Sequence, residues 1–546
     1  MQTLTIAALL MIALLALKRA ENRKRPLRRR LSRWTRRFSA GPESDPFTKR
    51  DLVKSISIMG AAGSGKTSSS GFQIGRAAVR HRDIGGLIIA SKPEDRVFWQ
   101  GVFEACGRLD DLIIFGPDTD HAFDFIAFEK GDARDVTDCI LTVAETLSRQ
   151  GGDSQDPFWV QQQRRTIHNA AEVLRLAHGA INTWDLQRFI NDAAISQEMF
   201  ESETWQAGFH NASLALAFQN AHTDRDVHDL NLAAKEFWLN EWPLMADKTR
   251  SSILAGVLGY LHVYNTGMVR ERISGRTTIT PEVFDQGKWV LVDFPVANYG
   301  VGGAFIAGAW KYATERHVLR RHAGPDTPIT VIWIDEYQNH ITSFDFKYLS
   351  ECRSHKGCMV VLTQSLHSYF ASIGGKEAQS HAKGLLTNFG TKVFHALGDA
   401  ESAEYAASLI GRDVLYLGGG GQSGRLDEVF AHSPMHTHWS QHFESLLQAR
   451  AFMMDFDGRA GERPHGGRLG DPLRQPVQQR LKPHARGLLA EVIHVDAAAA
   501  SARIPSMSVA QSFSALYNLS YALTLVVALI RRGSAAGRST RTLSSP

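Results

Sequence analysis

The sequence predicts an α/β protein built on a doubly wound parallel sheet, with an all-helical region inserted into it. Hydrophobic, strand-like runs alternate with helical patterns before residue 133 and after residue 270, and this alternation is typical of parallel sheets covered by helices. Within residues 133–270, apolar residues instead recur at helical spacing, and no convincing strand appears. A chain of 546 residues is also too long for one compact core, so we expect several domains.

The first residues of the chain predict a membrane anchor. Residues 1–17 are almost wholly apolar, at the short end of what spans a bilayer. Residues 18–37 then carry eleven Lys and Arg against one acid, a net charge of +10, so the rest of the chain carries −5 of the total of +5. Because positive flanks stay in the cytoplasm, we expect a single-pass protein whose bulk is cytoplasmic, with residues 18–50 as a basic juxtamembrane linker. An interfacial amphipathic helix is the alternative for residues 1–17.

A glycine-rich motif after a short strand predicts nucleotide binding. Ile56 and Ile58 alternate with serines, and the sequence from residue 60 reads G-x-x-x-x-G-K-T. In such a loop, glycines let backbone N–H groups wrap phosphate oxygens, the lysine reaches the β- and γ-phosphates, and the threonine hydroxyl holds Mg²⁺. A helix over Ser68–Arg80 would direct its positive N-terminal end at the phosphates. We therefore predict that ATP and Mg²⁺ bind through Gly60, Gly63, Ser64, Gly65, Lys66, Thr67 and Ser68. A chance Gly/Ser-rich loop is the alternative.

The remaining elements follow from the apolar runs. Residues 51–132 are predicted to be the first part of the nucleotide-binding domain, with strands at 85–91 and 110–117 around a helix. The second part is expected at 271–460, with a helix at 302–322 and strands at 288–296, 328–338, 356–365, 390–398 and 450–458. Residues 461–546 are predicted to be a loosely ordered tail. The apolar run within it, 515–530, is expected to be an interfacial or packing helix, with a second membrane span as the alternative.

The all-helical region 133–270 is rich in large aromatic residues. At irregular spacing in amphipathic helices such residues are usually core, and stacking on DNA bases is the alternative. The residues concerned are Phe158, Trp159, Trp184, Trp205, Phe237, Trp238 and Trp242.

A second motif after a buried strand predicts the hydrolytic part of the site. The hydrophobic run Val331–Ile334 ends in Asp335 and Glu336, and ligands gather at the carboxyl ends of parallel strands. We expect Asp335 to orient the Mg²⁺ shell and Glu336 to polarise the attacking water. Gln364 ends the next strand and is expected to sense the γ-phosphate or that water, with strand-end capping as the alternative. Arg353 is a candidate for the positive side chain that a neighbouring subunit supplies in ring motors, with a solvated surface arginine as the alternative.

Four stretches together resemble the type IV secretion coupling proteins, the TraG/TraD family of conjugative DNA transfer. They read IMGAAGSGKTSS, WIDEYQNHI, ECRSHKGCMVVLTQSL and LLTNFGTKVFHALGDAESAEYAASLIG, and the resemblance covers about residues 51–460. It implies a RecA-like P-loop fold of the FtsK/HerA branch and a homo-hexameric ATPase at the bacterial inner membrane. It further implies that the protein recruits a relaxase with its single-stranded DNA, the relaxosome, and delivers it to a type IV secretion channel. The resemblance also supports the roles given above and a trans-acting role for Arg353.

One feature departs from that family. Its members usually carry two N-terminal spans, whereas this sequence shows one short apolar run before the glycine-rich motif. The sequence therefore does not decide how this protein would dock on a secretion channel. A coupling protein with a short anchor and a protein that serves a mobilisable element through another channel are both compatible with the sequence.

Three functions compete on the sequence alone. The first is an ATP-driven DNA translocase, and the second is a nucleotide-gated receptor that recruits the relaxosome without pumping DNA. The third is a pilus-assembly ATPase of the same secretion machines, which normally has a long domain before the P-loop. An Asn-Lys-x-Asp motif for guanine is not found, which disfavours a GTPase. The four cysteines form no C-x-x-C pair, which disfavours a zinc site or a disulfide framework.

Overall fold

The computed structural model describes residues 47–129, 132–148, 157–422, 435–453 and 527–528. The chain divides into two compact units, and three of the boundaries between them fall inside strand β1 (Ile56–Met59), strand β6 (Gly357–Thr363) and helix α17 (Leu366–Ile373). Unit 1 comprises residues up to Ile56, Phe72–Val361 and Ala371–Asn388, and unit 2 comprises Ser57–Gly71, Leu362–Phe370 and the residues from Phe389 onward. The predicted anchor at 1–17, most of the linker at 18–50 and most of the tail at 461–546 lie outside the described residues. Among the described residues, no helix combines the length and the hydropathy that crossing a bilayer requires.

The core of unit 1 is a parallel sheet. Its strands lie in the order β6, β5, β2, β4 and β3, and each neighbouring pair is parallel. The register pairs Ile84 with Ile329 and Leu112 with Trp289. The strands are β2 (Ile84–Ile89), β3 (Leu112–Phe115), β4 (Trp289–Val292), β5 (Ile329–Ile334) and β6 (Gly357–Thr363). All but β3 are buried at every position, because helices cover both faces of a parallel sheet.

Two helices show that both faces of this sheet are covered. Helix α4 (Glu94–Ala105) packs Phe103 against Trp289 with ring centroids 5.9 Å apart. Helix α15 (Val296–Arg320) packs Trp310 against Phe115, 5.1 Å apart. Phe115 pairs with Val292, three residues after Trp289 on β4, and residues an odd number apart point to opposite faces of a strand. The predicted doubly wound α/β arrangement is therefore confirmed. This part also contains the helices α2 (Lys49–Leu52), α3 (Phe72–Val79), α5 (Phe125–Phe128), α16 (Phe344–Glu351) and α18 (Ala378–Thr387) and the short helices η2 (Leu109–Asp111), η6 (Pro281–Gln286) and η7 (Tyr337–Asn339).

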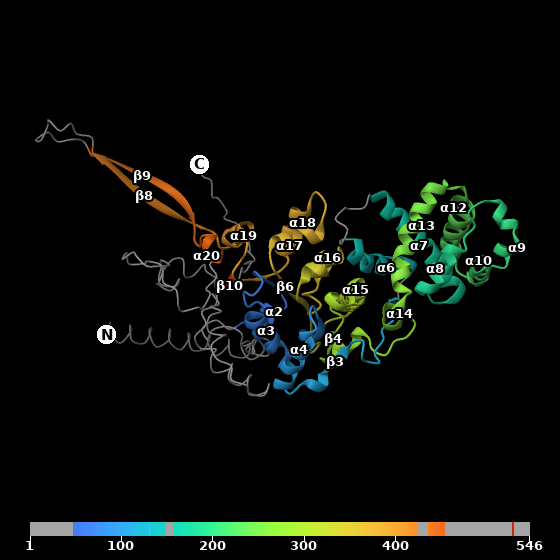
Figure 1. The fold of residues 1–546 in the computed structure, drawn as a ribbon, viewed down its shortest axis with the longest axis horizontal. Helices are drawn as coiled ribbons and strands as arrows, with labels where there is room; N and C mark the ends of the chain where they lie inside the picture. The colour runs from blue at the N-terminus through green and yellow to red at the C-terminus, as the bar shows by residue number, and fades with distance from the viewer. Residues whose placement is uncertain (1–46, 130–131, 149–156, 423–434, 454–526, 529–546) are drawn as a thin grey trace, which may run out of the picture. The chain divides into compact units, whose positions relative to one another are not determined.

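The described residues of 133–273, which are 133–148 and 157–273, form a helical region that is gathered at one end of unit 1 (Figure 1). The 22-residue helix α7 is its centre, because α6, α8, α10, α11, α13 and η5 all pack against it. Helices α6 and α14 also pack against α15 and so attach the region to the sheet. The helices are α6 (Ala133–Ser148), α7 (Pro157–His178), α8 (Thr183–Asn191), η4 (Glu198–Glu201), α9 (Glu203–Gln206), α10 (Phe209–Asn220), α11 (Asp224–Leu230), η5 (Asn231–Glu241), α12 (Trp242–Leu244), α13 (Asp247–Tyr264) and α14 (Gly267–Ile273). The described residues here contain no strand, as the sequence predicts.

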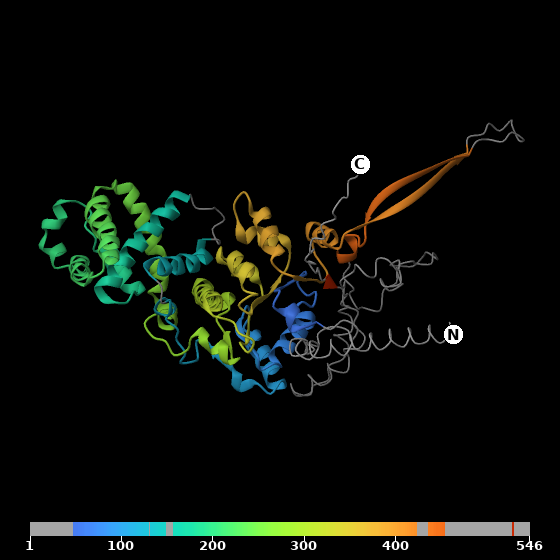
Figure 2. The ribbon, with the colours of Figure 1, turned by 180° about the vertical axis from the view of Figure 1, so that it is seen from behind.

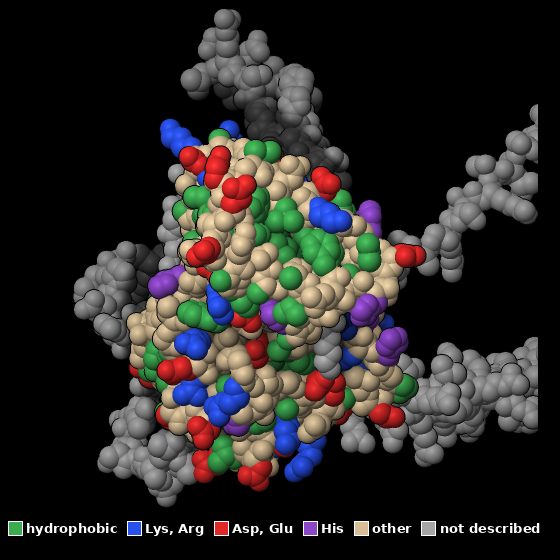
Figure 3. All heavy atoms as spheres, turned by 90° about the vertical axis from the view of Figure 1, so that its right-hand side faces the viewer, with side chains coloured by type: hydrophobic (Ala, Val, Ile, Leu, Met, Phe, Trp, Pro, Cys, Tyr) green, Lys and Arg blue, Asp and Glu red, His purple; other side chains and the backbone are tan. Residues whose placement is uncertain are grey.

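Most of the aromatic residues of this region are core residues. Trp205, Phe237, Trp238 and Trp242 are at most 8% exposed, which confirms that interpretation for these four. Phe158 and Trp184 are 48% and 53% exposed. Figure 3 views this end of the molecule, where hydrophobic side chains lie at the surface among charged ones. The exposed large hydrophobic residues of the region are Phe158, Trp184, Ile195, Leu216, Phe218, Val227, Leu232 and Leu244.

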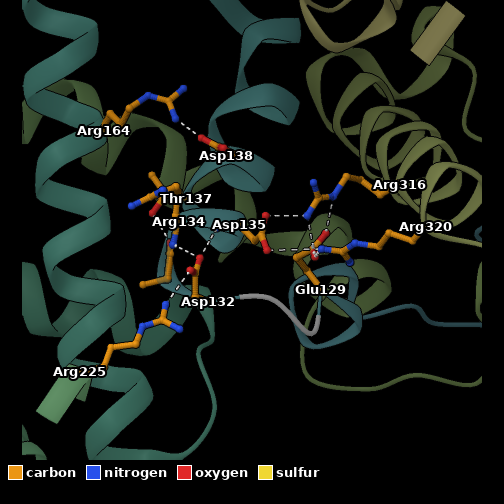
Figure 4. A network of polar contacts seen from close by, with 11 residues as sticks. Glu129, Asp132, Arg134, Asp135, Thr137, Asp138, Arg164, Arg225, Arg316 and Arg320 are labelled. Carbon is orange, nitrogen blue, oxygen red and sulfur yellow. Dashed lines mark hydrogen bonds and ion pairs between the residues drawn. The ribbon is translucent and has the colours of Figure 1, made fainter. Parts of the chain in front are cut away.

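An ion-pair network anchors the start of the helical region to α15. Glu129 and Asp135 accept from Arg316, at 3.1 Å and 2.7 Å, and both also pair with Arg320 (Figure 4). The Glu129 side chain is only 4% exposed, so this carboxylate is enclosed by its two arginines. Nearby, Asp132 accepts from the backbone N–H groups of residues 134 and 135 at the start of α6. Polar contacts therefore fix the point where the chain enters the helical region.

The strands of unit 2 lie side by side. β1 (Ile56–Met59) adjoins the end of β6, where Gly60 N donates to Thr363 O, and it adjoins β7 (Thr391–Phe394), where His395 N donates to Met59 O. Helix α19 (Ala400–Ile410) follows β7, and Figures 1 and 2 show an antiparallel hairpin extending away from it. This hairpin pairs β8 (Arg412–Gln422) with β9 (Met435–Ser445), and the sequence analysis missed it.

Two expectations about the end of the chain are wrong where the structure describes it. The strand predicted at 450–458 begins instead as helix α20 (Arg450–Met453), in which Phe452 is buried and its carbonyl accepts from Leu397 N at 2.7 Å. Of the apolar run 515–530, only Val527–Ala528 is described. These two residues form strand β10, antiparallel to β7, and not a helix. In both places the partner is a segment distant in the chain, so local hydrophobicity was a poor guide.

Candidate functional site

The predicted phosphate-binding loop lies in unit 2, between β1 and the helical turn η1 (Thr67–Gly71). β1 is buried at every position and leads the chain into the loop at Gly60. Gly63 and Gly65 have φ angles of 76° and 84°, in the left-handed region that favours glycine. A Cβ atom at Gly63 would find nothing within 4 Å, so the loop is open on that side. Successive N–H groups in such a turn form a concave binding site for anions.

The side chains of this loop fit a phosphate group with its metal ion. Lys66 is 8% exposed, and its Nζ donates to Gly60 O at 2.6 Å and to Ala61 O at 3.0 Å. The Oγ of Ser64 is buried and makes no hydrogen bond within the part of the chain that is described. Thr67 is half-buried at the start of η1. A cation, an available hydroxyl and an open glycine-rich backbone are the groups that a nucleotide phosphate and Mg²⁺ require. The exposed Ser68 adds a second hydroxyl to the same turn.

The two acidic residues of the second motif lie at the carboxyl end of β5 in unit 1, as predicted from the sequence. Asp335 is 6% exposed, its Oδ1 accepts from Glu336 N at 2.8 Å, and its backbone carbonyl accepts from Ser91 Oγ at 2.6 Å. Glu336 is half-buried, and its Oε2 accepts from Gln338 Nε2 at 2.6 Å. The backbone of Glu336 is left-handed, with φ 48° and ψ 50°. The two carboxylates are thus held by separate contacts.

Sequence reasoning missed a third carboxylate in this part of unit 1. Asp95, the second residue of α4, accepts from the backbone N–H groups of Ser91 and Lys92 at 2.8 Å and 3.0 Å. Burial raises the pKa of the Asp95 carboxyl; the two N–H donors oppose this shift, and the negative charge of Asp335 adds to it. Asp95 therefore lies within the electrostatic influence of Asp335. The available signal was the polar stretch that follows the strand predicted at 85–91.

The remaining candidates lie at the ends of elements. Gln364 directly follows β6 and is half-buried in unit 2. Arg353 is exposed in unit 1, in the turn after α16. Unit 2 thus holds Gln364 together with the whole glycine-rich loop, and unit 1 holds Arg353 together with Asp335 and Glu336. His395, which follows β7, is a further residue in contact with the loop that the sequence analysis did not identify.

Solved structures similar to this chain include two kinds of bacterial protein, both at low sequence identity. The unbound bacterial conjugative coupling protein TrwB is 13% identical, with 76% of this chain and 82% of that chain covered and a TM-score of 0.47. TrwB in complex with ADP and Mg²⁺ is 14% identical over 76% and 82% of the two chains, with a TM-score of 0.46. VirB4 of Thermoanaerobacter pseudethanolicus is 14% identical over 65% and 80%, with a TM-score of 0.38. No protein-family model and no curated protein sequence matches the chain.

Proposed function

We propose that this chain is a membrane-anchored, ATP-driven DNA translocase, the coupling protein that delivers a relaxosome to a type IV secretion channel. The observation that carries the proposal is the geometry of the loop from Gly60 to Thr67. It combines two left-handed glycines, a buried lysine and an available serine hydroxyl directly after a buried strand. This combination suits the triphosphate of a nucleotide. The order of motifs along residues 51–460, which resembles the coupling proteins, favours DNA transfer over other uses of ATP.

In the proposed mechanism the glycine-rich loop binds and orients the triphosphate. Lys66 Nζ exchanges its contacts with the carbonyl oxygens of Gly60 and Ala61 for the β- and γ-phosphate oxygens, because an anionic oxygen is the stronger acceptor. The backbone N–H groups around Gly65 bind the same phosphates. Thr67 and Asp335 are the residues proposed to hold Mg²⁺, which when bound would neutralise charge on the β- and γ-oxygens.

Glu336 is the proposed base in the hydrolytic step. Its carboxylate would accept a proton from the attacking water, and Gln364 would hold that water or report the γ-phosphate. The Glu336 side chain is half-buried, and its Oε2 accepts from Gln338 Nε2. Arg353, supplied by a neighbouring subunit of a homo-hexamer, would stabilise the charge that develops on the transferred phosphoryl group. Its exposure in unit 1 suits a role at a subunit boundary.

The proposed partners follow from the same function. They are single-stranded DNA with its relaxase, the other relaxosome proteins and components of the secretion channel. The proposed location is the bacterial inner membrane, reached through residues 1–17, with the bulk of the chain in the cytoplasm.

The test is the ATPase rate of the full chain in detergent, measured alone and with single- or double-stranded DNA. We expect hydrolysis that DNA accelerates and that Lys66→Ala abolishes, because the phosphate clamp then lacks its cation. Binding of ATP without hydrolysis under any of these conditions would point to a nucleotide-gated receptor. An ATPase rate that DNA does not change would point to a pilus-assembly ATPase. Full activity of Lys66→Ala would contradict the site assignment itself.

A further inference from the structure

His395 bridges two positions of the glycine-rich loop from the end of β7. Its side chain is 6% exposed, its Nδ1 lies 3.0 Å from the carbonyl oxygen of Ser64, and its Nε2 lies 2.7 Å from Ser70 Oγ. All of these residues belong to unit 2. The backbone reinforces the contact, because His395 N donates to Met59 O at 2.8 Å and Ala61 N donates to Ala396 O at 2.7 Å. The imidazole therefore contacts both the middle of the loop and the helical turn η1 that follows it.

These partners assign the tautomer of His395. A carbonyl oxygen only accepts, so Nδ1 must carry the proton and donate to Ser64. In the neutral ring Nε2 is then an acceptor, and the hydroxyl of Ser70, which also lies 3.4 Å from the carbonyl oxygen of Lys66, donates to Nε2 over the shorter distance of 2.7 Å. Both contacts are thus made by one neutral imidazole, in which each nitrogen has a distinct role.

The hydrogen bond from His395 to the carbonyl oxygen of Ser64 determines the orientation of the Ser64–Gly65 peptide. In a trans peptide the C=O and the following N–H point in opposite directions. The carbonyl of Ser64 is held on His395, so the N–H of Gly65 points away from His395. Within the described residues, no backbone carbonyl outside regular helices and strands accepts from the N–H of Gly65. An N–H group without such a partner is the donor that a phosphate oxygen would need.

We propose that His395 is a positioning residue for nucleotide binding, which holds the Ser64–Gly65 peptide with its N–H directed at the phosphate and ties the loop to η1 through Ser70. The inference rests on the proposed nucleotide site and adds a residue outside the glycine-rich motif to it. His395 does not touch the reacting atoms in this scheme. Its contribution is a pre-ordered loop, so it strengthens the binding of substrate and transition state alike.

The test measures the Kd of the full chain for a fluorescent ATP analogue with Mg²⁺, together with KM and kcat for ATP. His395→Ala removes both hydrogen bonds, and we expect Kd and KM to rise about thirtyfold while kcat changes less than about twofold, since each bond contributes about 1 kcal/mol. His395→Asn retains a donor at the position of Nδ1 and lacks the acceptor for Ser70. We therefore expect His395→Asn and Ser70→Ala to show the same smaller rise in Kd, with no further rise when the two are combined.

The control is His367→Ala in the same unit, whose side chain is 60% exposed and which should bind the analogue like the original chain. If the original chain fails to bind the analogue, the proposed function is wrong. A second outcome is that the original chain binds the analogue, Lys66→Ala does not bind it, and both His395 variants bind it as tightly as the original chain. In that case the inference about His395 is wrong and the proposed function stands. Should His395→Ala fail to fold, His395→Asn and its combination with Ser70→Ala decide the question. Additive effects of His395→Asn and Ser70→Ala on the Kd would contradict a hydrogen bond between these two side chains.

Discussion

At the scale of single residues, Glu336 stands out by its backbone. It is one of three non-glycine residues with positive φ among those described, and it directly follows Asp335, the first residue after β5. A left-handed conformation costs a side-chain-bearing residue about 1 kcal/mol or more, and such strain persists where the surroundings hold it in place. Here the N–H of Glu336 is bonded to the Asp335 carboxylate and its side chain accepts from Gln338. The strain therefore supports a functional role for this glutamate, which its position in the sequence alone only suggested.

Two substitutions of Glu336 are expected to affect ATP hydrolysis and the stability of the fold differently. We expect Glu336→Gln to bind ATP with unchanged Kd and to hydrolyse it about 10²–10⁴-fold more slowly, because an amide is a poor base. We expect Glu336→Gly to be equally inactive yet more stable by about 1 kcal/mol, because glycine adopts the left-handed backbone without strain. Single-turnover ATPase assays and urea unfolding measure the two effects. A Glu336→Gln variant that turns over ATP at the original rate would show that another residue is the base.

Two buried histidines predict acid sensitivity of unit 1. Burial lowers the pKa of His210 to about 4, although its bond to the Phe189 carbonyl opposes the shift, and burial together with Lys311 lowers the pKa of His340 to about 4. Both are neutral in the folded chain, whereas in the unfolded chain they gain protons below about pH 6.5. Their contribution to stability is therefore complete above pH 6.5 and is lost as the pH falls toward 4.

The corresponding variant is His210→Phe, which keeps an aromatic ring against Phe189, 4.0 Å away between centroids in the original pair. Between pH 6 and pH 4.5, each histidine adds about 1.4 kcal/mol per pH unit to the slope of unfolding free energy against pH. We expect the slope to fall by that amount in His210→Phe, as measured by urea unfolding at several pH values. An unchanged slope would mean that His210 is already protonated in the folded chain.

At the scale of elements, the attachment of the helical region to the sheet depends on α15. Helices α6 and α14 pack against α15, and Glu129 and Asp135 pair with Arg316 and Arg320 on it. Glu129 is enclosed, whereas the neighbouring pair between Asp132 and Arg225 joins side chains that are 42% and 74% exposed. The two kinds of pair in one network allow a matched comparison, because buried ion pairs depend strongly on both partners and exposed ones are screened by water.

We expect Glu129→Gln to lower the free energy of unfolding by about 3 kcal/mol, since two guanidinium groups lose a buried carboxylate between them. Arg225→Ala in the same network should cost less than about 0.5 kcal/mol, because its partner stays in contact with water. Thermal or urea unfolding followed by far-ultraviolet circular dichroism measures both. Equal effects of the two substitutions would contradict the distinction between an enclosed and an exposed pair.

At the scale of the whole molecule, the proposed function requires assembly. Arg353 lies in the turn after α16, exposed, while the residues proposed to bind nucleotide and metal are half-buried or buried in their own units, apart from Gly63 and Ser68. An exposed arginine that serves its own subunit's site is unusual, whereas one that completes a neighbour's site must be accessible. Ring motors use such a residue to link hydrolysis to the state of the adjacent subunit.

We expect Arg353→Ala to bind ATP normally and to hydrolyse it at least about 10³-fold more slowly, the scale of known arginine fingers. Mixing Arg353→Ala with Lys66→Ala chains should restore part of the activity, because some boundaries then pair an intact loop with an intact arginine. Co-purification through two different tags verifies that mixed rings form. Mixed rings as inactive as either variant alone would show that Arg353 does not act across the boundary.

The sequence by itself determined the elements whose pattern is local. Strands of a parallel sheet are buried on both faces, so they appear as continuous apolar runs, and β2, β4, β5, β6 and β7 were predicted at the correct places. Glycine is favoured where φ is positive in a tight loop, so the glycine-rich loop around Gly63 and Gly65 was recognisable as well. Helical periodicity likewise indicated the helical region that contains α7 and α13.

Only the tertiary structure decided features that depend on distant partners. The hairpin β8–β9 escaped prediction because the run Gly418–Gly421 lacks alternation and β8 finds its pairing in another segment. Helix α20, expected as a strand, is placed by the contact of Phe452 with Leu397. His395 touches Ser64, 331 residues away in the chain, and nothing near either residue signals the contact. Local propensity acts through neighbouring residues, whereas burial and side-chain hydrogen bonds are created only when remote segments pack together, and this packing determines which polar residues surround the loop.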